Sequence, residues 1–223
     1  MRSVFMREQV VDDDLRHYVE TAILPIYDRF DAAHGRNHAE KVIESSLGMA
    51  QMFDVNINMV YTVAAFHDVG LLDGRETHHL VSGRILRADN QLLRWFSSSQ
   101  IEIMAQAVED HRASAAHTPR SIYGCIVADA DRNMDIDVIV TRTLQYGFAN
   151  YPQLGRDEHI NRALNHLRQK YGRNGYLRLW ISGSSAEKAL HDLWNRIDDS
   201  DSIRRLVADR YDKLMAIGCM HHF

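Results

Sequence analysis

The stretch AAFHDVGLL, residues 64–72, places His67 and Asp68 directly behind a run of small and apolar residues. Apolar residues recur at three- and four-residue steps from about Asn58 onward, which predicts a helix with one buried face. Gly70 is a residue type that commonly ends a helix, so the pair is expected at a helix C-terminus. Because a buried carboxylate without a partner is strongly unfavourable, Asp68 requires a counter-charge nearby.

The composition indicates a globular protein. Of the 223 residues 45% are hydrophobic, and only 3 are Pro and 12 Gly, so we expect a continuous fold with few disordered linkers. No apolar stretch is long enough for a secretory signal or a membrane span. The two cysteines, Cys125 and Cys219, lie far apart and indicate neither a disulfide framework nor a thiolate metal site. These features predict a cytoplasmic protein with no membrane partner.

The charge of the chain favours a small-molecule partner over a polyanion. With 26 basic and 30 acidic residues the formal net charge is -4, which argues against a broad positive surface for nucleic acid. The 13 histidines are the unusual feature of the composition. Histidine is the commonest metal ligand in proteins and also titrates near neutral pH, so their positions matter.

Helical periodicity runs through the chain, and no series of alternating strands competes with it. The fold class is therefore predicted as all-α. Up to residue 132 we expect helices over about 12–30 with a kink at Pro25, 37–53, 58–70, 77–86, from a capping box at Ser99 to 111, and from Thr118 and Pro119 to 129. Beyond it we expect helices over about 136–146, 157–171, from a cap at Ser184, and 203–217, with a loop at 147–156 and a loop or lid at 171–185.

Imidazoles and carboxylates recur on these helix faces and ends. Six nitrogen and oxygen donors come from separate helical segments that a bundle can bring together, namely His38, His67, Asp68, His79, His111 and Asp129. Such a donor set suits Mn, Fe or Zn ions better than calcium or a metal that prefers thiolates. A divalent cation would also neutralise Asp68 and Asp129 on their apolar faces.

The same stretches resemble the HD-domain metal-dependent phosphohydrolase superfamily. The matching pieces are HGRNHAEKV at 34–42, AAFHDVG at 64–70, HHLVSG at 78–83, EDHR at 109–112 and VADADR at 127–132. The resemblance implies an HD-domain helical bundle with additional C-terminal helices. We expect a single HD-type domain over residues 1–223, with a metal-binding core at about 34–132 and a helical extension at about 133–223.

In that superfamily the first histidine, the His-Asp pair and the distal aspartate form the core metal site, which maps onto His38, His67, Asp68 and Asp129. Members with two ions add two histidines between the pair and the distal aspartate, where His79 and His111 stand. His78 is the alternative to His79 as the first of these added ligands, and Ser82 and Gly83, which follow, favour His79. The resemblance implies one or two divalent ions of Mn, Fe, Co, Zn or Mg, bridged by Asp68, with His67 and Asp68 as the catalytic pair.

The reaction that the resemblance implies is hydrolysis of a phosphoester or phosphoanhydride by a metal-activated hydroxide. We expect a small phosphorylated substrate, and we favour a nucleotide. The chain lacks the Gly-Tyr-Pro signature of the cyclic dinucleotide phosphodiesterases. Gly70, Leu71 and Leu72 also stand where the guanosine tetraphosphate hydrolases have an acidic pair, so both of these assignments are weakened.

A phosphorylated substrate also requires basic side chains. Six residues near the matching stretches are candidates for substrate binding, namely His34, Arg36, Lys41, Arg75, Arg112 and Arg132. We favour Arg75 and Arg112 among them, and His34 lies one helical turn before His38, where it can orient that ligand. Taken singly, an arginine of this kind more often belongs to a solvated helix face.

Two other functions stay open at this stage. Some proteins of the same superfamily use a matching His and Asp set to activate oxygen, so a di-iron oxygenase is the first alternative. The second is a non-catalytic module that binds metal or nucleotide. A homo-oligomer also stays open, and the motifs assign no role to the C-terminal helices.

Overall fold

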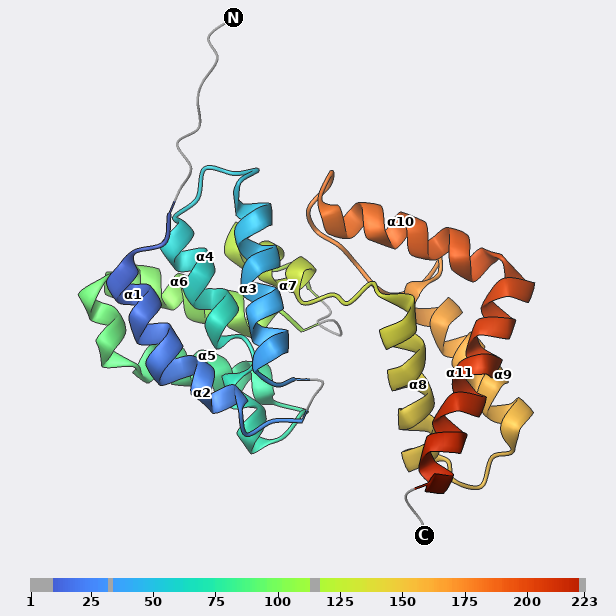
Figure 1. Ribbon diagram of the computed structural model, residues 1–223. Helices are drawn as coiled ribbons and strands as arrows, with labels where there is room; N and C mark the ends of the chain where they lie inside the picture. The colour runs from blue at the N-terminus through green and yellow to red at the C-terminus, as the bar shows by residue number, and fades with distance from the viewer. Residues whose placement is uncertain (1–9, 32–33, 113–116, 221–223) are drawn as a thin grey trace, which may run out of the picture. The chain divides into compact units, whose positions relative to one another are not determined.

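The structure is a computed structural model of the 223-residue chain, and it describes residues 10–31, 34–112 and 117–220. Every regular element in these ranges is a helix, which confirms the all-α prediction (Figure 1). The chain divides into two compact units, residues 1–132 with 179–182 and residues 133–178 with 183–223. No helix in the described ranges is long and apolar enough to cross a membrane. The expectation that residues 1–223 act as one domain stays a prediction.

The first unit begins with one distorted helix, as the sequence predicts. Helices α1 (Asp13–Tyr18) and α2 (Leu24–Tyr27) are joined without a break by a π-helical turn over Val19–Ile23. The distortion lies just before Pro25, where the proline ring excludes the carbonyl group one turn earlier from regular hydrogen bonding. Tyr27 is the last residue of α2, and its side chain is fully buried.

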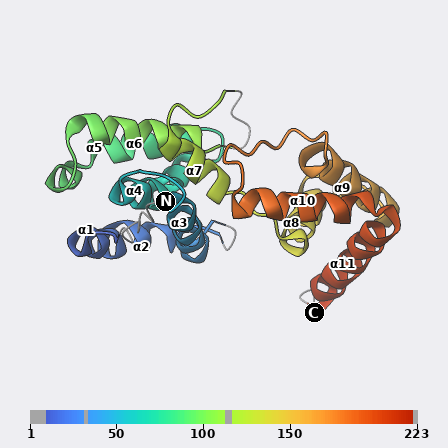
Figure 2. The same cartoon turned by 90° about the horizontal axis from the view of Figure 1, so that it is seen from above.

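Helix α4 (Ile57–Phe66) forms the core of the first unit, because all of its residues except Asn58 are buried. It packs against α3 (Arg36–Ala50), α6 (Ser98–Asp110) and α7 (Ile122–Ala130), and α5 (His78–Ala88) packs against α6. Figure 2 shows α4 between a layer with α5 and α6 and a layer with α1, α2 and α3. A helix enclosed on all sides can present polar groups only at its ends.

Two predicted helix starts in the first unit are wrong by a few residues. Helix α6 has its capping box at Ser97 rather than at Ser99, because the Ser97 hydroxyl accepts the Gln100 N–H and the Gln100 side chain accepts the Ser97 N–H. Helix α7 begins at Ile122 rather than at Pro119. Both errors arise because several serines and threonines precede each helix and any of them is a suitable cap.

Gly70 has a different role from the helix end that was predicted. Helix α4 already ends at Phe66, and Gly70 lies without a positive φ in a 3-10 turn over Val69–Asp73. A Cβ at Gly70 would lie 2.4 Å from the carbonyl oxygen of His78 and 2.5 Å from the backbone nitrogen of Ser82. Glycine is required because the backbone of α5 approaches this closely. The start of α5 is thereby held next to the end of α4.

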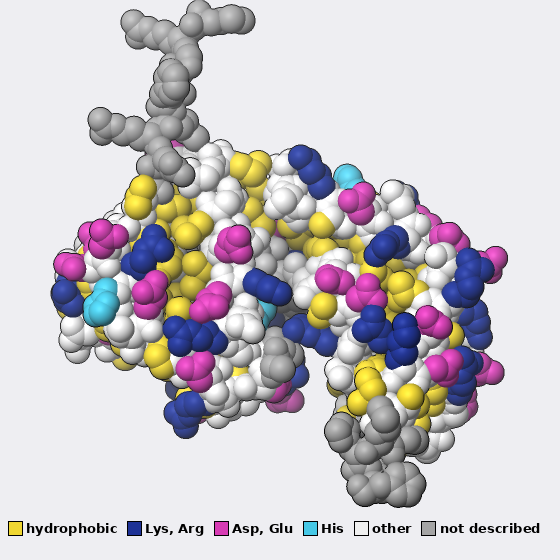
Figure 3. All heavy atoms as spheres, viewed as in Figure 1, with side chains coloured by type: hydrophobic (Ala, Val, Ile, Leu, Met, Phe, Trp, Pro, Cys, Tyr) yellow, Lys and Arg dark blue, Asp and Glu magenta, His cyan; other side chains and the backbone are white. Residues whose placement is uncertain are grey.

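The second unit contains α8 (Ile136–Asn150), α9 (Arg156–Tyr171), α10 (Ser185–Asp198) and α11 (Ser200–Met220). Helices α8, α9 and α11 pack against one another, and α10 packs against α9 and α11. The Ser184 hydroxyl caps α10 by accepting the Glu187 N–H, as predicted. Helix α8 continues to Asn150, so the predicted loop at 147–156 is shortened to residues 151–155. On the face shown in Figure 3, acidic and basic side chains are interspersed over the coloured residues of both units.

Candidate metal centre

Six side chains from five helices of the first unit meet at one cluster. Each stands at or near a helix end, namely His38 in α3, His67 and Asp68 after α4, His78 in α5, His111 after α6 and Asp131 after α7. His67, Asp68 and His111 are at most 4% exposed. Two overlapping groups have the spacing of metal ligands, and Asp68 belongs to both of them. The cluster is thus a candidate for one or two ions.

The first group surrounds one oxygen of Asp68. His38 Nε2 lies 3.3 Å from His67 Nε2, and Asp68 Oδ2 lies 3.9 Å and 3.5 Å from these two nitrogens. Asp131 Oδ1 also lies near both histidines, 3.2 Å from His38 Nε2 and 3.9 Å from His67 Nε2. Two nitrogens and the Asp68 oxygen, with the Asp131 oxygen beside the nitrogens, form a mixed donor set that suits Mn, Fe, Co or Zn.

The second group surrounds the other oxygen of Asp68. His78 Nε2 lies 3.3 Å from His111 Nε2, and Asp68 Oδ1 lies 3.2 Å and 3.4 Å from these nitrogens. Asp68 Oδ1 is buried and makes no hydrogen bond to the described residues. The two oxygens of Asp68 thus face two different pairs of histidines. A carboxylate that bridges two ions has the same arrangement.

Three of the histidines are oriented by the same local contact. The Nδ1 atoms of His67, His78 and His111 lie 2.7, 2.8 and 2.6 Å from the carbonyl oxygen three residues earlier in the chain. A ring that donates from Nδ1 presents a lone pair at Nε2, which is the tautomer that ligates a metal. The lone pairs of His78 and His111 then face each other across 3.3 Å. Such a contact is repulsive unless a proton or a metal ion lies between the nitrogens.

The pKa values of His67 and Asp68 are also shifted by their neighbours in the cluster. Burial lowers the pKa of His67, but the negative charges of Asp68 and Asp131 outweigh it and raise the pKa to about 9. Burial raises the pKa of Asp68, but the charges of His67 and His111 hold it well below its usual range. His67 is therefore the histidine of the cluster whose protonated form the neighbouring carboxylates stabilise. Metal binding at His67 would displace that proton.

The structure brings His78 to the cluster where the sequence favoured His79. Successive residues of a helix point about 100° apart, so only one residue of this pair can face the other ligands. His79 is half-buried beside the cluster, where burial and then the charge of His78 lower its pKa to about 4. We correct the candidate ligand from His79 to His78.

Asp129, the other predicted ligand, lies outside the cluster, and Asp131 lies in it instead. The Asp129 carboxylate is 1% exposed, as its place on an apolar stripe predicts, but backbone N–H groups surround it. It accepts hydrogen bonds from the Trp180 N–H at 3.0 Å to both oxygens and from the Ile181 N–H at 2.9 Å. Asp129 therefore holds residues 179–182 in the first unit, and Asp131 is the candidate ligand.

Three of the six predicted substrate-binding residues lie together beside the cluster. The Arg75 guanidinium donates to His34 Nε2 at 2.9 Å, and His34 Nδ1 donates to Asp31 at 2.8 Å. Arg112 donates to the Glu76 carbonyl at 2.6 Å, so its guanidinium is anchored to the loop that carries Arg75. This loop leads directly into His78. Arg75 and Arg112 could therefore contact an anion bound at the cluster.

The other three predicted residues are placed differently. Arg36 pairs with Glu40 and Asp28 on the surface, and Lys41 is exposed on α3. Arg132 is directed to the cluster itself, because it donates to the His111 carbonyl at 3.1 Å and lies 3.5 Å from Asp131. The structure therefore favours Arg132 as a group that braces two candidate ligands.

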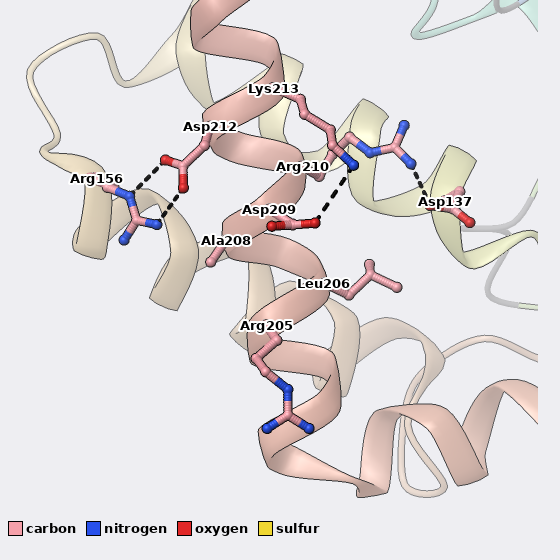
Figure 4. A pocket seen from close by; sticks show the side chains of 9 residues that line it. All are labelled: Asp137, Arg156, Arg205, Leu206, Ala208, Asp209, Arg210, Asp212 and Lys213. Carbon is pink, nitrogen blue, oxygen red and sulfur yellow. Dashed lines mark hydrogen bonds and ion pairs between the residues drawn. The ribbon is translucent and has the colours of Figure 1, made fainter.

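A pocket in the second unit has a different character. It has a volume of about 580 Å³ and is lined by α11 with Asp137 and Arg156 (Figure 4). Arg156 pairs with Asp212, Arg210 with Asp137 and Lys213 with Asp209. Most of its charges are thus neutralised by exposed partners, as on a solvated helix surface.

One comparison with known proteins bears on the cluster. Residues 35–133 match the family model of the HD domain, and this range includes all six side chains of the cluster. The match confirms the resemblance inferred from the five sequence stretches. No curated protein and no solved structure gave a significant match.

Asp129 in α7 and Asp131, which follows this helix, should respond differently to substitution. We expect Asp131→Asn to weaken binding of Mn or Zn at least about 10-fold, because it removes a charged donor. Asp129→Asn should leave metal affinity unchanged and lower the free energy of unfolding by about 1–3 kcal/mol, because the carboxylate accepts buried N–H groups. Calorimetric metal titration and denaturant unfolding measure both effects. Loss of metal by Asp129→Asn alone would reverse the assignment.

The adjacent histidines of α5 offer a second matched pair. His78→Ala should reduce the bound metal from two ions toward one, because His78 faces Asp68 Oδ1 at 3.2 Å. His79→Ala should leave the metal content unchanged. Elemental analysis of the purified variants gives the stoichiometry, and an equal loss in both variants contradicts the placement of His78.

Proposed function

We propose that the HD domain at residues 35–133 is a metal-dependent phosphohydrolase that cleaves a phosphoester or phosphoanhydride of a small molecule. The observation that carries this proposal is the Asp68 carboxylate, whose two oxygens face separate histidine pairs and whose Oδ1 has no hydrogen-bond partner among the described residues. Such a buried group requires positive charge. When bound, divalent ions supply that charge, lower the pKa of water and polarise a phosphoryl group.

The residues of the chain prepare the site for this chemistry. His67, His78 and His111 have their rings fixed by carbonyl groups of their own segments, so their Nε2 atoms are already directed at Asp68. His38 and Asp131 lie next to each other in the cluster, and Arg132 contacts both His111 and Asp131. Little rearrangement is therefore needed to bind an ion.

Recognition of the substrate is proposed for the basic side of the cluster. Asp31 accepts the proton of His34 Nδ1, which leaves His34 Nε2 to orient the Arg75 guanidinium. A guanidinium held in one orientation can bind a phosphate with two parallel hydrogen bonds. Arg112 is anchored beside it on the Glu76 carbonyl. Within this class we favour a nucleotide, in line with the superfamily that the motifs resemble.

The experiment that tests the function is a screen of phosphorylated metabolites. The full chain is stripped of metal, reconstituted with Mn, Fe, Co or Mg, and assayed for release of phosphate or of a phosphorylated product. We expect turnover of at least one nucleotide, and a loss of at least about 100-fold in Asp68→Asn, since even groups behind metal ligands contribute 10–100-fold. Nucleotide binding without turnover under any metal contradicts the proposal in favour of a binding module. A mixed-valence iron signal without hydrolysis contradicts it in favour of a di-iron oxygenase.

Arg75 provides a test of phosphate recognition. Arg75→Ala should raise the KM of the substrate by about 10-fold or more with unchanged metal content, because a charge-assisted hydrogen bond is lost. Arg84→Ala, which removes an exposed arginine in helix α5 a few residues further along the chain, is the matched control and should leave KM unchanged. Steady-state kinetics with the substrate from the screen decides, and equal KM values in the two variants exclude Arg75 from the site.

A further inference from the structure

We propose that Tyr27, which precedes the HD domain in the sequence, is a positioning residue that fixes the backbone of Asp68. The inference rests on the proposed metal site. Its basis is a pair of hydrogen bonds at the end of α4: the Tyr27 hydroxyl donates to the Ala65 carbonyl at 2.9 Å and accepts the Asp68 N–H at 3.2 Å. A phenolic hydroxyl has one proton and free lone pairs, so both bonds form at once.

The end of α4 needs such a partner because of how His67 is oriented. In a continuing helix the Asp68 N–H would bond to the Ala64 carbonyl. That carbonyl accepts from His67 Nδ1 instead, at 2.7 Å, and the helix ends at Phe66. The N–H of Asp68 and the carbonyl of Ala65 are left at a buried helix end, where an unsatisfied group is costly. The Tyr27 hydroxyl satisfies both.

The surroundings of Tyr27 fit a positioning role. Its side chain is 0% exposed, and its ring lies 6.1 Å from the His67 ring with an interplanar angle of 32°. Phe30 also packs edge-on against the Tyr27 ring, at a centroid distance of 5.5 Å. These contacts hold the hydroxyl in one position, next to the backbone of Asp68.

This placement carries a functional consequence. Asp68 lies outside the helix, with φ -114° and ψ 6°, so α4 alone does not set its backbone. Small displacements of Asp68 would move Oδ1 and Oδ2 relative to both histidine pairs at once. Metal sites are sensitive to groups that hold their ligands, typically by 10–100-fold in affinity or activity. A residue from α2, outside residues 35–133, would then help to determine the geometry of the HD-domain site.

The test compares Tyr27→Phe with Tyr18→Phe. Tyr18 is a matched control because its hydroxyl also donates a hydrogen bond, to Asp89, but takes no part in the cluster. We expect Tyr27→Phe to weaken Zn or Mn binding by about 10-fold or more, and to lower kcat at saturating metal with an unchanged substrate KM. Tyr18→Phe should bind metal as the wild type does, although its melting temperature falls. Equal metal affinity in Tyr27→Phe and the wild type overturns the proposal.

The metal-binding measurement and one further readout keep the outcomes distinct. Weakened metal binding in Tyr27→Phe supports the positioning role even where the wild-type chain hydrolyses no phosphate, so failure of the proposed function is recognised separately. Should Tyr27→Phe not fold, amide hydrogen exchange of the metal-free wild type replaces it. The Asp68 amide should then exchange as slowly as the amides inside α4. Exchange as fast as at an exposed loop overturns the proposal.

Discussion

A carboxylate buried among histidines is the constraint on which the first unit depends. Asp68 is 4% exposed, and burying its charge is unfavourable unless positive charge or hydrogen bonds compensate. The fold meets this requirement by ending helices around it, so that His38, His67, His78 and His111 all direct Nε2 atoms toward its oxygens. Gly70 permits the close approach that brings His78 there. Cations bound at the cluster would add to this compensation, and the spacing of the side chains is consistent with a metal site.

The second principle of the site is that three of the candidate ligands are oriented by their own segments. A histidine just beyond a helix or loop can donate from Nδ1 to the carbonyl three residues earlier, which satisfies a terminal carbonyl and fixes the metal-binding tautomer together. His67, His78 and His111 all use this contact. At α4 it displaces the Asp68 N–H from its helical partner, and the proposed role of Tyr27 follows from that displacement. At the ends of α4 and α6, the histidine that follows the helix thus satisfies a terminal carbonyl and is oriented as a candidate ligand by the same contact.

The sequence predicted the all-α fold and most helices because the apolar period is strong, and it placed His67 and Asp68 at a helix end. His79 in place of His78 is an error of one residue, which neither the period nor the motif resolves in the first turn of a helix. Asp129 was rightly expected to be buried, but backbone N–H groups some fifty residues downstream donate hydrogen bonds to it. A local sequence pattern does not predict such a distant contact. Tyr27 was missed for the same reason. A rule that ligands follow helix ends would have favoured Asp131.

The most direct test of the account is the location of bound ions by anomalous scattering from crystals of the full chain grown with Mn or Zn. We expect two anomalous peaks, each next to one oxygen of Asp68, the first among His38, His67 and Asp131 and the second between His78 and His111. This result would establish Asp68 as the bridge between two ions. Ions bound elsewhere on the chain, or a structure in which Asp68 contacts none of them, would contradict the central claim.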